Sequence, residues 1–394
     1  MKIIIKLFFL SVLFSILAIR LNAITVFSND TNKIDITGQF NIAYFNRLSS
    51  EHTYDFIKNN RYHSQLGILA ENKTLKGLTT RLFFEARINN KFYYPEDIDK
   101  NYYESLEVNQ IYLELEDSLG KTRLGNFNSQ VYYNTVATTD KSYVFLLDAG
   151  YSFVGQSSSS FGNYNDSDFS TKAVYQGIGH YNQYGNVVIA VEVESPRNNL
   201  QARNDFEEDT FDTKAFNQKF TAATSLSYKG EKVGISAGYK RIQNEQRTNF
   251  SGLSFNDNML VSDNILSSFY LSLNKFYLAL AGGYYKNLKI AGIDHVGASA
   301  FMQYKLTKLT PYIGYQFLYA DDINKNGHIY GLADNKNYSF DQSVAVVGLS
   351  YNVYDGLTVG IEHNNDVRSK GQRESSLLNN VNNDITAIYF KYSL

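Results

Sequence analysis

The chain has 394 residues, of which 37 are basic and 39 are acidic, and it contains no cysteine. The lack of cysteine excludes a disulfide scaffold and thiolate metal sites. A formal net charge of −2 at pH 7 argues against a nucleic-acid partner, which would require a clustered basic surface. The 32 tyrosines and 27 phenylalanines, with only three prolines, favour strands over helices or disorder.

The first 23 residues have the pattern of a secretory signal peptide. Lys2 and Lys6 precede an apolar run over residues 7–19, and a small residue, Ala23, follows. Cleavage after Ala23 would remove three basic residues and no acidic one, leaving a mature domain, residues 24–394, with 34 basic and 39 acidic residues and a net charge of −5. The alternative is an uncleaved anchor, although the run is shorter than the roughly 20 residues of a membrane-spanning helix.

About sixteen later segments alternate apolar and polar residues, and most are near the 9–11 residues that a transmembrane strand needs. No later apolar run is long enough for a transmembrane helix. Backbone groups in lipid must be paired internally, so such a chain crosses a membrane only as a closed barrel. The predicted strands are residues 33–45, 62–71, 78–88, 108–117, 121–127, 171–181, 187–194, 220–228, 233–240, 265–273, 276–285, 295–306, 310–319, 342–353, 357–363 and 385–394.

The connections between these strands alternate between short and long. The short ones are mostly rich in glycine, asparagine, aspartate or lysine, as tight hairpins require. This alternation is typical of transmembrane barrels, with short turns on the periplasmic side and long loops outside. The long connections are residues 46–61, 89–107, 128–170, 195–219, 241–264, 286–294, 320–341 and 364–384.

Charged side chains gather on one face of their predicted strands, opposite to leucine and isoleucine. An arginine or lysine facing lipid near the midplane costs about 2–4 kcal/mol, so the charged face is predicted to point inward. About 16–18 strands leave an aqueous channel inside. The alternative is that these charges satisfy one another without setting selectivity. The inward set is Arg81, Glu85, Arg87, Glu114 and Glu116.

Three short segments resemble the general diffusion porins of Gram-negative bacteria. Residues 29–38 resemble the mature N-terminus of that family, and Leu66-Gly67 followed by Glu71 resembles its second strand. Residues 153–155 resemble the exit from the family's constriction loop. The resemblance implies an all-β transmembrane antiparallel barrel of sixteen strands, a homotrimer, and a third long loop, here residues 128–170, that folds inward and narrows the pore.

The family's pore sets basic residues on the wall against acidic residues on this loop, and the chain departs from that pattern. Asp140 and Asp148 are the nearest acidic candidates on the loop, and Arg81, Arg87 and Arg123 are candidates to replace part of the basic wall. We therefore expect a weak preference for cations. Local matching places the family's basic wall positions at Gln39, Gln65, Glu107 and Gln156.

The resemblance also implies partners. These are outer-membrane lipid, lipopolysaccharide and the barrel-assembly machinery that inserts the chain. The family often ends in phenylalanine, which that machinery reads, whereas this chain ends in Leu394 with Phe390 and Tyr392 close by.

The sequence contains only partial matches to metal-binding and catalytic motifs. Residues 322–327 match the first half of a calcium-binding loop, but the twelfth position is Ala333 where a bidentate glutamate is needed, so an ordinary solvated loop over 321–334 is the alternative. No serine elbow or nucleotide loop is present, and we expect neither an enzyme nor a cofactor. The six histidines lack ligand spacing: His52, His63, His180, His295, His328 and His363.

The sequence therefore predicts an outer-membrane porin for passive diffusion of ions and small hydrophilic solutes. One alternative is a channel selective for a sugar or an acidic nutrient, with aromatic side chains along its interior. Another is a barrel adhesin, which would place its activity in loops 195–219 and 241–264.

Overall fold

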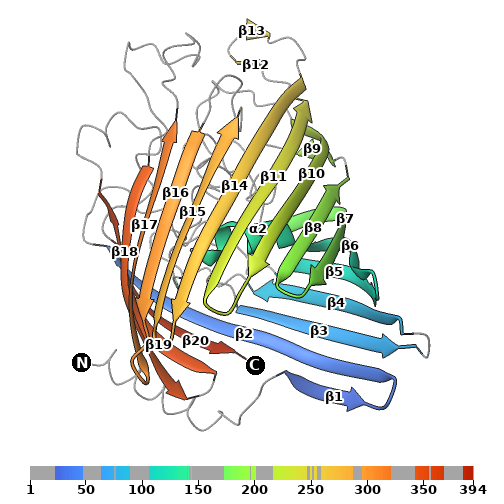
Figure 1. Ribbon diagram of the computed structural model, residues 1–394, viewed down its shortest axis with the longest axis horizontal. Helices are drawn as coiled ribbons and strands as arrows, with labels where there is room; N and C mark the ends of the chain where they lie inside the picture. The colour runs from blue at the N-terminus through green and yellow to red at the C-terminus, as the bar shows by residue number, and fades with distance from the viewer. Residues whose placement is uncertain are drawn as a thin grey trace, which may run out of the picture.

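Antiparallel strands form a sheet that closes on itself in the computed structural model (Figure 1). No helix among the described residues is both long and apolar enough to cross a membrane. The structure describes residues 23–47, 64–74, 77–88, 106–139, 141, 143, 173–195, 197–200, 216–245, 249–250, 253–254, 259–286, 295–320, 342–354, 356–367 and 385–393.

Sixteen strands make the ring, and each pairs with the next one in the ring. The last strand returns to the first, from Gln39 opposite Ser393 to Arg47 opposite Ile385, so the ring has no free edge. The strands are β2 (Asn32–Arg47), β3 (Ser64–Lys73), β4 (Thr79–Ile88), β5 (Leu106–Asp117), β6 (Gly120–Asn128), β7 (Ala173–Tyr184), β8 (Val187–Glu194), β10 (Phe216–Lys229), β11 (Val233–Glu245), β14 (Met259–Leu273), β15 (Phe276–Lys286), β16 (His295–Tyr304), β17 (Leu309–Ala320), β18 (Gln342–Tyr354), β19 (Leu357–Asp366) and β20 (Ile385–Ser393).

Smaller elements complete the described structure. Strand β1 (Ile24–Ser28) pairs with the same edge of β2 that β20 uses further along, from Ile24 opposite Ile36 to Ser28 opposite Lys33. The others are β9 (Arg197–Leu200), which pairs with β10, the hairpin β12 (Asn249–Phe250) and β13 (Leu253–Ser254), the helix α2 (Gln130–Asn134) and the 3-10 turn η3 (Val136–Thr138).

All sixteen predicted strands are confirmed, and so are their short turns at one end of the barrel. Asn274, in the two-residue turn between β14 and β15, has φ +48°, a left-handed conformation that asparagine tolerates better than most residues. The sequence did not predict β1. It also placed 241–264 in a loop, whereas β11 and β14 continue into this region because their backbones remain paired from Arg241 opposite Asp263 to Glu245 opposite Met259.

The two faces of the barrel differ as the alternation predicts. Large apolar side chains stand exposed on the outer face, among them Leu82 at 54%, Ile178 at 55% and Ile265 at 57%. Glu114 and Lys240 lie on the inner face and are buried. An exposed apolar surface that runs around a whole barrel is suited to hydrocarbon, and the protein is a transmembrane antiparallel β-barrel.

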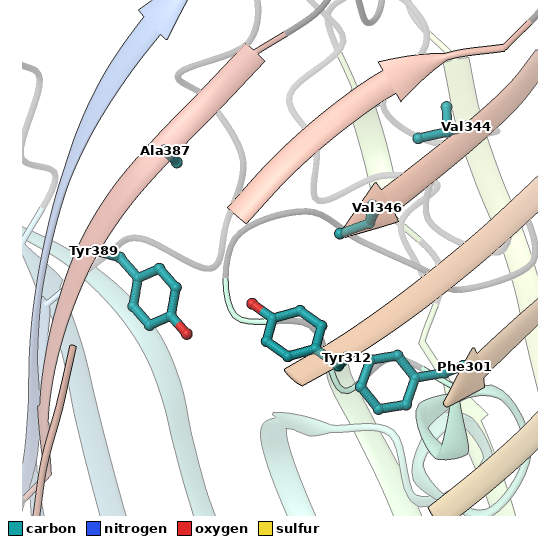
Figure 2. Packing of buried hydrophobic residues seen from close by; sticks show 6 residues of the cluster. All are labelled: Phe301, Tyr312, Val344, Val346, Ala387 and Tyr389. Carbon is teal, nitrogen blue, oxygen red and sulfur yellow. The ribbon is translucent and has the colours of Figure 1, made fainter. Parts of the chain in front are cut away.

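Tyrosine rings lie over glycines on the inner face. A Cβ added to Gly348 would come within 2.1 Å of the ring of Tyr312, which is its register partner. Tyr312 packs beside Phe301, with ring centroids 5.8 Å apart. Figure 2 shows both rings, together with that of Tyr389 on β20. Glycine in a strand commonly marks such a close approach. The rings therefore lie along the wall instead of across the interior. The same packing is seen at Gly179 with Tyr181, Gly234 with Tyr270, Gly283 with Tyr285 and Gly360 with Tyr389.

A charge on the outer face is expected to destabilise the barrel in lipid. Leu280 lies near the middle of β15 and is 47% exposed. Leu280→Arg should lower the free energy of unfolding by about 2–4 kcal/mol, measured by urea unfolding in phosphatidylcholine vesicles.

The matched control is Gln303→Arg, which adds the same charge to the inner face of the neighbouring strand β16. It should change the free energy of unfolding by less than about 1 kcal/mol. Equal losses for the two variants would contradict the assignment of the two faces.

Candidate functional site: the inner wall and the inward segment

A row of ion pairs crosses the inner wall on four neighbouring strands. The register places Glu71 opposite Arg81, Arg81 opposite Glu114, and Glu114 opposite Arg123. Arg81 Nε lies 2.6 Å from Glu71 Oε2 and its Nη1 lies 2.7 Å from Glu114 Oε1, while Arg123 Nε lies 2.7 Å from Glu114 Oε2. Arg81 also pairs with Glu116. We call these five residues the charge ladder.

The charges of the ladder are paired along the wall, with Lys73 and Lys121 outside the ladder pairing with Glu71 and Glu116. Glu114 is buried at 4% exposure and accepts from two guanidinium groups, an arrangement that offsets the cost of removing a carboxylate from water. The guanidinium of Arg123 also lies 4.8 Å from the ring centre of Tyr112 and 5.2 Å from that of Tyr181. The Arg81 and Arg123 side chains keep exposed fractions of 20% and 22%.

Sequence reasoning found four members of the ladder and missed Glu71. Glu71 falls on the inward face of its strand, but only the register of β3 against β4 shows that it lies opposite Arg81. The predicted inward residue Glu85 lies outside the ladder. Its Oε1 accepts from Asn109 Nδ2 and, at 3.1 Å, from Gln110 Nε2.

A bulge in β5 explains why two consecutive residues meet the same carboxylate. Glu85 of β4 is opposite Gln110 of β5, and Ala86 is opposite Val108. Asn109 is therefore an extra residue in β5, without a register partner in β4. Gln110 then accepts from the backbone N–H of Asn128 at 3.0 Å. This bond holds the end of β6, where the chain leaves the wall.

The remaining predicted site residues fall into two groups. Gln39, Gln65, Arg87 and Glu107 occupy one register row across β2 to β5. Asp140, Asp148 and Gln156 lie outside the described residues, as does the candidate calcium loop 321–334. Within the described part of the chain, no group of three or more His, Asp or Glu side chains is placed to hold a metal ion.

After Asn128 the chain turns into the barrel. The described residues 129–139, 141 and 143, here the inward segment, include α2 and η3, and α2 is seen within the ring of strands in Figure 1. Val131 packs with Tyr181, Ala190 and Ala223 of the wall. Tyr132 and Val136 pack in a second cluster with Leu266, Ala281 and Tyr285. The predicted inward fold of this connection is confirmed for these residues.

Glu192 of β8 holds the start of the inward segment. Its carboxylate accepts from Ser129 Oγ at 2.6 Å and from the backbone N–H of Gln130 at 2.5 Å. Ser129 in turn accepts from the N–H of Tyr132, which caps α2. Glu192 is 3% exposed, so both bonds are shielded from water.

Further bonds fix the segment along the wall as far as β19. Asn134 Nδ2 donates to Ser225 Oγ at 3.0 Å, and Tyr277 donates to the carbonyl of Thr138 at 2.9 Å. At the far end the N–H of Tyr143 donates to Glu362 Oε2 at 2.9 Å. A second wall carboxylate therefore holds the other end. The inward segment lies against the wall from β7 to β20, whereas the charge ladder lies on β3 to β6.

Comparison with solved structures finds barrels of the same fold. OmpF of Salmonella typhi, in complex with daunomycin, aligns over 95% of this chain and 100% of its own, with a TM-score of 0.67 and 14% identity. The outer membrane channel DcaP of Acinetobacter baumannii aligns over 94% and 100%, with a TM-score of 0.63 and 12% identity. The anion-selective porin from Comamonas acidovorans aligns over 92% and 100%, with a TM-score of 0.59 and 12% identity.

No protein-family model matches the sequence, and no curated protein does. At these identities the structural likeness shows the fold, which is that of the Gram-negative porins.

Removal of the Glu192 carboxylate is expected to loosen the start of the inward segment. Glu192→Gln replaces one acceptor oxygen by a donor, so Ser129 and Gln130 lose charge-assisted bonds, each of which typically contributes about 1.5–3 kcal/mol. Hydrogen exchange of a peptide covering 129–139, followed by mass spectrometry, should become faster by about tenfold or more.

The control is Glu231→Gln, in the exposed turn between β10 and β11, which should leave exchange in 129–139 unchanged. If Glu192→Gln folds and shows wild-type exchange in this peptide, Glu192 does not hold the segment.

Proposed function

We propose that this protein is an outer-membrane porin that forms a water-filled channel for passive diffusion of ions and small hydrophilic solutes. The observation that carries the proposal is the charge ladder on the inner face of a closed sixteen-stranded barrel. Guanidinium and carboxylate groups on this face require water or charged partners, while the outer face is apolar. Barrels of this size leave an aqueous interior.

The inward segment supports size exclusion. Its hydrogen bonds to Glu192 and Glu362 hold a folded stretch of chain against the wall inside the barrel. Solutes would pass between this stretch and the wall that carries the charge ladder. Gln39, Gln65, Arg87, Glu107, Asp140 and Asp148 remain proposed pore-lining or constriction residues, together with Glu85 and the ladder.

A weak preference for cations is part of the proposal. The ladder contains three glutamates and two arginines that are paired with one another, so the ladder itself supplies no net positive charge. Lys73 and Lys121 pair with its outer glutamates, Glu71 and Glu116, at 3.3 Å and offset the remaining negative charge. The mature chain has an excess of acidic residues. The field at the pore is therefore expected to be weakly negative.

The proposed function includes export across the inner membrane, insertion into the outer membrane and assembly of a trimer. Strand β1 begins at Ile24, directly after the predicted cleavage site at Ala23. We propose that the mature chain is inserted by the barrel-assembly machinery among outer-membrane lipid and lipopolysaccharide, and that it forms a homotrimer. One V. cholerae barrel with a similar fold, with a TM-score of 0.59 and 13% identity, is described in a trimer form.

Planar-bilayer recording tests the channel directly. The purified protein should insert in groups of three equal conductance steps and conduct ohmically without an energy source. In a KCl gradient the reversal potential should show a weak preference for cations. A protein that inserts fully folded without conductance would contradict the porin assignment, and clear anion preference would contradict the charge argument.

A matched pair of ladder variants tests whether these residues set selectivity. Arg81→Gln leaves Glu71, Glu114 and Glu116 with one cationic partner fewer, so the reversal potential should shift toward stronger cation preference. Glu114→Gln removes the carboxylate between Arg81 and Arg123 and should shift it in the opposite direction. Equal reversal potentials in both folded variants would show that the ladder is structural only.

A solute-selective channel is the second candidate. Two inward aromatic side chains lie next to each other on β4 and β5, because the ring centroids of Phe83 and Tyr112 are 5.2 Å apart. Such a surface suits stacking on a sugar ring. Saturable block of the conductance by one sugar or acidic solute would favour this candidate over general diffusion.

A further inference from the structure

Three lysines lie together at the short-turn end of the barrel, in the turn between β14 and β15 and in the turn between β16 and β17. They are Lys275, Lys305 and Lys308, and all three are exposed. The backbone N–H of Lys305 donates to the carbonyl of Lys275 at 2.7 Å, so the two turns are in contact. Lys305 and Lys308 flank one tight turn, in which the N–H of Leu306 donates to the carbonyl of Leu309 at 2.8 Å. We call these three lysines the lysine cluster.

The described residues around the lysine cluster supply no acidic partner. None of their carboxylates lies within ion-pair distance of the three ammonium groups. Asp263 is the one acidic residue of β14 to β17, and it faces outward, opposite Arg241. Lys308 Nζ donates to the carbonyl of Val353 at 3.3 Å, which leaves its charge uncompensated. The cluster therefore presents three positive charges to the mouth of the barrel.

The adjoining turns do not reverse this charge. In the turn between β10 and β11, Glu231 is flanked by Lys229 and Lys232, and all three are exposed. That turn therefore adds a net positive charge. Asp355, in the turn after β18, lies outside the described residues.

Lysines on the opposite part of the same rim have a different environment. Lys73 Nζ lies 3.3 Å from Glu71 Oε1, and Lys121 Nζ lies 3.3 Å from Glu116 Oε1. These lysines belong to β3 and β6, next to the charge ladder. The rim is therefore divided into a part with paired charges and a part with excess positive charge.

The three charges act together because they are close. Neighbouring strands lie about 4.8 Å apart, which is less than the Debye length of about 10 Å at 0.1 M salt. Like charges on neighbouring strands disfavour each other, and an anion bound between them relieves that repulsion. Tyr277, two residues along the chain from Lys275, donates through its hydroxyl to the carbonyl of Thr138 at 2.9 Å. An anion on the cluster would thus lie below the inward segment.

We propose that the lysine cluster binds a small multivalent oxyanion, such as a polyphosphate, at the turn-side mouth of the pore, and that the bound anion lowers the conductance. The inference rests on the proposed channel function. An anion with several charged oxygens can contact two or three of the lysines at once, whereas chloride meets them singly. Lysine ammonium groups bind phosphate oxygens as compact point charges. In the proposed membrane placement the short turns are periplasmic, so the site faces the periplasm.

Planar-bilayer recording in neutral phosphatidylcholine tests the site with inorganic tripolyphosphate as the probe. In 0.1 M KCl, the conductance should fall when the probe is added to one chamber and stay unchanged when it is added to the other. Lys275→Gln combined with Lys305→Gln should raise the half-blocking concentration by about tenfold or more, because two of the three charges are lost.

The matched control is Arg241→Gln combined with Lys286→Gln. These two exposed cations face outward at the other end of β11 and β15, and their removal should leave the half-blocking concentration unchanged. In 1 M KCl, where the Debye length is about 3 Å, the wild-type block should weaken by about tenfold or more. Equal block from both chambers, or equal loss in the two double variants, would overturn the proposal.

Isothermal titration calorimetry of the folded barrel in detergent keeps this inference separate from the proposed function. Wild-type pores that conduct and show no one-sided block by tripolyphosphate would overturn the anion site alone. Tripolyphosphate binding that depends on Lys275 and Lys305, in a barrel that never conducts, would support the anion site and overturn the porin assignment.

Discussion

The structure depends on the complete pairing of backbone groups around the ring. In hydrocarbon an unpaired N–H or C=O costs several kcal/mol, and pairing of β2 with β20 removes the edge that an open sheet would expose. Once the ring is closed, successive residues of each strand must face alternately the lipid and the interior of the barrel. The apolar face is then directed to lipid, and residues such as Glu114 and Arg123 are directed inward, where they find each other across neighbouring strands.

Buried glutamates on the inner wall make two different kinds of contact. Glu114 is neutralised by two arginines on the wall, while Glu192 and Glu362 accept donors from the inward segment. The ion pairs make a fixed polar surface on the wall, and the bonds to the inward segment hold that stretch of chain inside the barrel. Tyrosines lying over glycines, as Tyr312 does over Gly348, keep large rings close to the wall. Together these contacts give the proposed pore a defined narrow region.

Much of the fold was predictable because strand periodicity and turn composition are local properties. Every strand of the ring was found from alternation, including β8 with its bounds unchanged. The candidate site was only partly predictable. Arg81 and Glu114 were recognised as inward-facing, but Glu71 joined them only through the register of β3. Glu192 and Glu362 were not recognised, because their partners Ser129 and Tyr143 are far away in the sequence.

The sequence by itself determined the class of fold and the side of each strand that faces lipid, because the free energy of a charge in hydrocarbon acts on each residue separately. Tertiary structure alone decided which inward groups meet. It also decided where the chain after Asn128 enters the barrel, and that Lys275 and Lys305 lie on turns that are in contact. These outcomes depend on strand register and on the bulge at Asn109, and a shift of one residue would send each side chain to the other face.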